Sequence, residues 1–132
     1  MKFLVILKAT PDSEAGIMPA PEHLEAATRF NEELAKDGVL LAAEGLWPSS
    51  KDSARLEFGP KGPTQVDGPF AETKELVGGF WMIKADSRDE VIERFKRAPF
   101  SRGETVEIRR MFVPEDFAEF ASPEMIERWE KV

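Results

Sequence analysis

The segment from Leu76 to Ala85 constrains the fold most, because it is apolar at both odd and even positions. Side chains alternate between the two faces of a strand, so Phe80 lies on one face and Trp81 on the other. A strand with this pattern is buried on both sides of its sheet. Gly78 and Gly79 weaken a strand, and they predict a bulge or a close backbone approach.

The rest of the chain alternates short strands with two helices. Pro21 at a first helical position and Gly38 just past an end predict a helix over residues 21–36. Ser87 and Glu90 form a capping box that begins a second helix, which runs to about Arg97. Apolar runs predict further strands, the third and fourth of which pair as a hairpin: 3–7, 39–46, 54–58, 64–66 and 105–113.

This order, β-α-β-β-β-α-β, predicts an α+β fold of the ferredoxin-like split βαβ type with an antiparallel sheet. Two helices cover one face of such a sheet, and the other face needs a cover because its central strands are apolar there too. A second copy of the sheet in a homodimer supplies that cover. We divide the chain into a domain over residues 1–113 and a helical tail over 114–132. The tail packs on its own domain or on the dimer partner.

Composition excludes several classes of function. The 132 residues include no cysteine, which excludes disulfides and thiolate chemistry and is consistent with the cytoplasm, where we expect the protein. A net charge of −7 disfavours nucleic-acid binding. The apolar start is too short for a signal peptide or a membrane span. With one histidine and no metal-ligand spacing, phosphate loop or dinucleotide fingerprint, we expect no metal and no cofactor.

One nine-residue stretch carries a family resemblance. Asp67-Gly68-Pro69-Phe70-Ala71-Glu72-Thr73-Lys74-Glu75, followed by Gly78-Gly79-Phe80-Trp81, resembles the signature of DGPF-domain proteins within the wider YCII-related family. The resemblance covers roughly residues 1–112. It implies a ferredoxin-like domain that pairs into a dimeric α/β barrel. Most members have no assigned activity, so it implies no particular reaction, and it does not decide whether the chain is an enzyme.

Asp67 is the first candidate site residue. Its carboxylate could act as a general base or orient a ligand, or it could simply cap the Gly68-Pro69 turn. The charged residues that follow could line a pocket mouth and hold a ligand, or form solvent-exposed pairs that contribute little: Glu72, Lys74 and Glu75.

Other candidates lie on the predicted strands. Glu44 follows an apolar run, where a buried carboxylate needs a partner, and Arg109 on the last strand could provide it. The alternative is a structural salt bridge or a rim position. Trp81 could wall an apolar pocket or belong to the core.

His23 is the only histidine, and it lies in the first turn of a predicted helix, where we expect it to be exposed. The wider family includes members in which a His–Asp pair is associated with acid–base work. The position of His23 departs from that pattern, which argues against histidine catalysis.

These residues predict a small-molecule site near the DGPF loop with acid–base activity. The catalytic candidates are Asp67, Glu72 and Glu44, and the ligand-binding candidates are Lys74, Glu75, Trp81 and Arg109. The alternative is a non-catalytic binding or regulatory module with a protein partner in sigma-factor transcription control, since DGPF-type domains are associated with such factors.

Overall fold

A four-stranded antiparallel sheet forms the centre of the computed structural model, which describes residues 1–132. The order across the sheet is β2 (Leu40–Gly45), β5 (Val77–Lys84), β1 (Lys2–Lys8) and β6 (Val106–Arg110). The two central strands, β1 and β5, are those whose apolar runs required burial on both sides.

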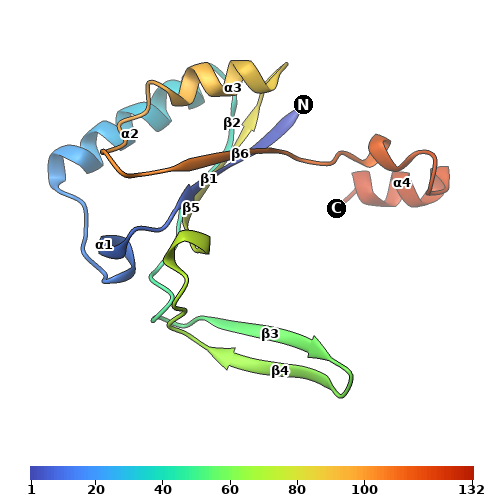
Figure 1. Ribbon diagram of the computed structural model, residues 1–132. Helices are drawn as coiled ribbons and strands as arrows, with labels where there is room; N and C mark the ends of the chain where they lie inside the picture. Colours follow the sequence, from blue (N-terminus) through green and yellow to red (C-terminus); the bar gives the residue numbers. More distant parts are fainter.

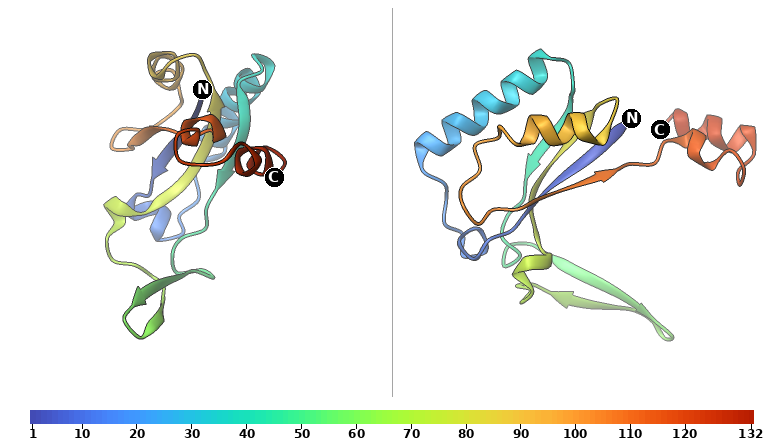
Figure 2. Two further views of the ribbon diagram at one scale, coloured as in Figure 1. Left: turned by 90° about the vertical axis from the view of Figure 1, so that its right-hand side faces the viewer. Right: turned by 45° about the horizontal axis from the view of Figure 1, so that its top comes forward.

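Two helices, α2 (Pro21–Lys36) and α3 (Arg88–Phe95), cover one face of this sheet (Figures 1 and 2). Each connects two strands of the sheet, which confirms the predicted α+β ferredoxin-like fold. Phe95 packs edge-on against Phe30 and Trp81, with ring centroids 5.2 and 5.3 Å away. The core between sheet and helices consists of Phe3, Val5, Phe30, Leu34, Ile83, Ala85, Val91 and Phe95.

The helix starts follow the sequence signals closely. Pro21 is the first residue of α2, and Gly38 has φ +74° just past its end. The Ser87 hydroxyl accepts a hydrogen bond from the Glu90 backbone N–H at 3.2 Å. The reciprocal bond of the predicted capping box is displaced by one residue, because the Glu90 carboxylate accepts from the Asp86 N–H.

The two glycines of β5 have the predicted roles. The pairing of β1 with β5 shifts so that Leu7 faces Gly79 while Lys8 faces Val77, which leaves Gly78 as a bulge. An added Cβ at Gly79 would lie 3.0 Å from the Glu44 carbonyl oxygen, so the backbones of β2 and β5 approach closely there.

Two segments project from the domain. Strands β3 (Ala54–Gly59) and β4 (Gly62–Asp67) pair as the predicted hairpin, here called the arm, which extends away from the four-stranded sheet (Figure 1). The tail follows β6 and contains a 3-10 turn, η2 (Pro114–Phe117), and a helix, α4 (Pro123–Glu130). It also extends away from the sheet, as Figure 1 and the right-hand view of Figure 2 show.

The sheet face opposite the helices, here called the open face, carries apolar side chains. Leu4 pairs with Met82 and Ile6 with Phe80 on this face, and all four are half-exposed. The whole chain exposes 10020 Å². A compact monomer of 14.9 kDa exposes about 7,000 Å², so the arm, tail and open face leave an excess of about 3,000 Å².

One polar bond ties the sheet to its helical cover, and it supplies a stability test. The Trp81 indole N–H donates to Asn31 Oδ1 on α2 at 2.8 Å. Asn31→Ala leaves this donor unpaired beneath the helix, so we expect the free energy of unfolding to fall by about 1–2 kcal/mol in urea unfolding. Asn31→Asp keeps an acceptor and should lose less. An equal loss in both variants would contradict a role for the hydrogen bond.

Candidate functional site

The DGPF loop is clamped against the loop that precedes the arm. The Gly68 N–H donates to the Ser53 carbonyl at 3.3 Å. An added Cβ at Gly68 would overlap the Ser49 carbonyl oxygen and the Ser53 hydroxyl, so only glycine fits. The Arg55 guanidinium lies over the Phe70 ring, 3.9 Å from its centroid, and attaches the base of the arm to the same loop.

Ser49 connects this loop to the N-terminal part of the chain. Its hydroxyl accepts from the Phe70 N–H at 3.0 Å and donates to Glu14 Oε2 at 2.6 Å. The Ser49 N–H donates to Glu14 Oε1 at 3.0 Å. Glu14 ends the one-turn helix α1 (Pro11–Glu14), which was not among the helices predicted from the sequence. The DGPF motif therefore positions α1 through a buried serine.

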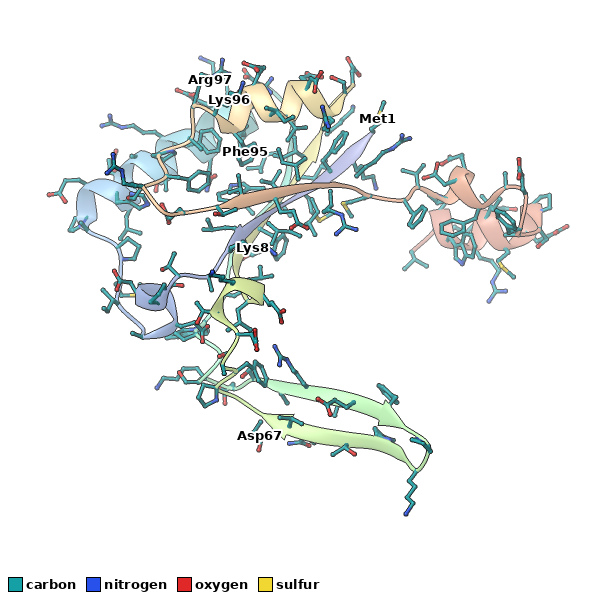
Figure 3. All side chains as sticks on the ribbon, in the orientation of Figure 1. Met1, Lys8, Asp67, Phe95, Lys96 and Arg97 are labelled. Carbon is teal, nitrogen blue, oxygen red and sulfur yellow. The ribbon has the colours of Figure 1, made fainter.

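Asp67 lies at the base of the arm, well separated from Lys8 on the sheet (Figure 3). Its exposed carboxylate accepts from Gln65 Nε2 at 2.8 Å. It lines an open cleft of about 490 Å³ whose other residues are mostly small and polar: Ser49, Ser50, Asp52, Ser53, Ala54, Gln65 and Gly68. Asp67 thus faces a cleft, and its catalytic role stays a prediction.

The charged residues after Asp67 do not converge with it. Glu72, Lys74 and Glu75 lie in and beside the turn η1 (Thr73–Glu75), all three are exposed, and none lines the Asp67 cleft. Trp81 packs under the helices against Phe95 and Phe100 and lies against the core, and its role as a pocket wall stays a prediction.

Glu44 and Arg109 lie on opposite edges of the sheet, because β2 and β6 are its two outer strands. The pairing expected for them within one chain is therefore absent, and the reason is strand order, which residue spacing does not reveal. Arg109 instead pairs with Glu107 at 3.3 Å, and Lys8 approaches the same carboxylate at 3.5 Å. The Arg109 hydrogen bond and the nearby Lys8 charge hold the pKa of Glu107 below its usual range.

A second cleft, of about 530 Å³, is lined by the only histidine. His23 is half-buried there, contrary to the exposed position expected from the sequence. Arg102, from the loop between α3 and β6, lines the same cleft. Neither side chain takes part in the ion pairs of the structure. The remaining lining combines polar and apolar groups: Thr10, Pro11, Asp12, Ser13, Ile17, Met18, Pro19, Ala20, Ser101, Gly103 and Glu104.

Residues far apart in the sequence form this cleft. Thr10 caps α1, accepting from the Ser13 N–H at 3.1 Å, and the adjacent Pro11 opens the helix. The Glu104 carboxylate closes the opposite loop by accepting from the Ser101 N–H. The Thr10-Pro11 cap signal was present in the sequence, but nothing local predicts that α1 faces residues 101–104. No three metal-binding side chains converge in the structure.

Comparison with known proteins gives one family and one related fold. The model of the YCII-related domain matches residues 1–115. Among solved structures the chain is similar to 5-chloro-2-hydroxyhydroquinone dehydrochlorinase (TftG) from Burkholderia phenoliruptrix AC1100, in complex with 2,5-dihydroxybenzoquinone. The identity is 20%, the match covers 85% of this chain and 94% of that chain, and the TM-score is 0.50. No curated protein matches. No helix of the structure is long and apolar enough to span a membrane.

The Ser49 link predicts a local stability difference between two adjacent serines. Ser49→Ala removes the bonds to Glu14 and Phe70 and leaves polar partners unsatisfied, so we expect unfolding free energy to fall by about 1–3 kcal/mol. Ser50→Ala, at an exposed neighbour, should change it by less than about 0.5 kcal/mol. Urea unfolding measures both, and equal values would show that the DGPF loop does not depend on Ser49.

Proposed function

The chain belongs to the YCII-related domain family. On this premise we propose that it binds a small ring-shaped molecule with hydroxyl or carbonyl oxygens in the His23 cleft, and that His23 acts on it as a general acid or base. One observation carries the proposal: His23 and Arg102 line the same cleft, and neither is held in an ion pair.

The chemistry of the lining fits such a ligand. A guanidinium donates charge-assisted hydrogen bonds to ligand oxygens, so Arg102 would orient the molecule. An imidazole gives or takes protons near neutral pH, which is the task of a general acid or base. Ile17 and Met18 are 60% and 75% exposed in the same lining, and they offer an apolar wall for a flat ring.

The structural neighbour supports the proposed ligand class by analogy. TftG is described as a dehydrochlorinase in complex with a dihydroxybenzoquinone, a flat ring that carries four oxygens. At 20% identity this likeness concerns the fold, so the ligand class depends on the cleft itself. Asp67, the first catalytic candidate from the sequence, faces its own cleft at the arm and is a second, separate candidate.

We further propose that the chain functions as a homodimer. The excess surface is about 3,000 Å² on each chain, or about 6,000 Å² for two chains, which reaches the upper end of obligate dimer interfaces, where about 2,000–5,000 Å² or more is buried in total. A two-stranded hairpin such as the arm is at best marginally stable by itself in water, so it needs a surface to pack on. A second copy would cover the open face and support the arm.

Ligand binding at the His23 cleft can be tested with 2,5-dihydroxybenzoquinone as a probe. His23 is the only histidine, so its ring C–H signals in NMR spectra are unambiguous, and we expect them to shift on titration. Arg102→Gln should weaken binding roughly tenfold or more, because it removes a charged donor. Arg97→Gln lies outside the cleft lining and is the matched control. Unshifted His23 signals, or equal affinities of both variants, would refute this ligand site.

The proposed homodimer can be tested by measuring the mass of the protein in solution. Light scattering coupled to size-exclusion chromatography should give a mass near twice 14.9 kDa at micromolar concentration. A mass near that of one chain would contradict the dimer, and it would leave the His23 cleft as a separate question.

A further inference from the structure

The open face carries charged side chains at both of its edges. One row of paired residues crosses the sheet on this face, from β2 to β6: Glu44, Phe80, Ile6 and Glu107. Residues that pair across strands share a face, so both carboxylates lie on the side of the apolar centre. Because β2 and β6 are the outer strands, Glu44 lies at one edge of the open face and Glu107 at the other.

The two edges carry opposite excess charge. Glu44 is exposed and takes part in none of the ion pairs of the structure. At the opposite edge, Glu107 is shared by Arg109, 3.3 Å away, and Lys8, 3.5 Å away. One edge therefore has an unpaired carboxylate, and the other has two cations for a single carboxylate.

The positions of these charges along the strands also agree. Arg109 follows Glu107 by two residues on β6, and Lys8 follows Ile6 by two residues on the antiparallel strand β1. The two cations therefore flank the row that contains Glu107, each about 7 Å from it along the sheet. Arginine and lysine side chains are long enough to reach across that distance. A further carboxylate beside β6, at the level of Glu107, would be in reach of both cations.

The direction of the two-fold axis decides which edges of two copies meet. In a face-to-face homodimer the axis runs between the two sheets and parallel to them. An axis along the strands places β2 of each chain beside β6 of the other. An axis across the strands places each edge against its own copy, which sets Glu44 against Glu44 of the partner subunit. Since like charges in contact disfavour association, the charge pattern selects the axis along the strands.

We propose that Glu44 of each chain pairs with Arg109 of the partner subunit, at both edges of the homodimer. This inference rests on the proposed homodimer and specifies how its two sheets are oriented. Each cluster of Glu107, Arg109 and Lys8 then receives a second carboxylate, which balances its two cations. The sequence predicted a pair of Glu44 with Arg109, and strand order prevents that pair within one chain. Association provides it between chains, and Glu44 then serves assembly in place of catalysis.

A charge exchange tests this pairing. Glu44→Lys leaves three cations for one carboxylate at each edge, and Arg109→Glu leaves three carboxylates for one cation. We expect each single variant to raise the dimer dissociation constant roughly tenfold or more. The chain that carries both substitutions restores the balance and should recover most of the loss. Glu32→Lys, at an exposed position on α2, is the matched control and should leave the constant unchanged.

The chain with both substitutions also separates the two axis directions. If each edge met its own copy, this chain would still place like charges together at both edges. A dissociation constant no lower than those of the single variants would therefore overturn the inference. Equal effects of Glu44→Lys and Glu32→Lys would overturn it as well.

Cross-linking tests the same contact without changing the charge balance of a cluster by reversal. The chain has no native cysteine, so Glu44→Cys and Arg109→Cys introduce single thiols. The two variants are mixed, allowed to exchange subunits and treated with a short bismaleimide. We expect a covalent mixed dimer, and several-fold less product from either variant alone. Glu32→Cys in place of Glu44→Cys is the control and should also give several-fold less product.

The remaining outcomes overturn specific claims. Efficient linking of Glu44→Cys chains to one another would show that like edges meet, so the inference would be wrong and the homodimer would stand. A dimer by light scattering that gives no cross-link of either kind would also overturn the inference alone. A monomer by light scattering would overturn the homodimer itself, and with it this pairing.

Discussion

The fold depends on a central pair of strands that is apolar on both faces. Helices α2 and α3 bury one face, where Val5 and Ile83 are fully enclosed. The other face holds Ile6 and Phe80 half-exposed, and nothing in the same chain covers it. Apolar burial is the main favourable term in folding, so a chain that buries only 11 of its 132 residues has a small core of its own. In the proposed homodimer, association would complete such a core.

The DGPF loop does not line the His23 cleft, but it is linked to that cleft through Ser49 and Glu14. Gly68 permits close contact with the Ser49 loop, and Ser49 passes that contact to Glu14 by two hydrogen bonds. Glu14 ends α1, whose first residues line the His23 cleft. The motif therefore has a structural role, since its backbone fixes a neighbouring segment, while the exposed Asp67 side chain lines an open cleft of its own.

The elements of the fold were predictable because their signals are local. Continuous apolar runs located β1 and β5, Pro21 and Ser87 located the helix starts, and the family match confirms the YCII-related resemblance. The site was not predictable in the same way. The distance between Glu44 and Arg109 depends on strand order across the sheet. The neighbours of His23 come from two segments, residues 10–20 and 101–104, that have no hydrophobic periodicity. The sequence left Trp81 open between a pocket wall and the core, because its hydrogen-bond partner, Asn31, lies fifty residues earlier.

In the proposed dimer, folding and association become one equilibrium. The stability of an obligate dimer depends on chain concentration, because unfolding also separates the two chains. Glu107 pairs with Ile6 across β6 and β1 and so lies on the open face, where it adds a pH dependence. Glu107 has a lowered pKa beside Arg109 and Lys8, so its contribution is present at neutral pH and is lost as the pH falls through that lowered value. Protonation would leave two cations unbalanced on the face that the partner covers. Acid would therefore remove this favourable contribution at the β6 edge of the sheet, and the change would be small because the ion pair is exposed to solvent.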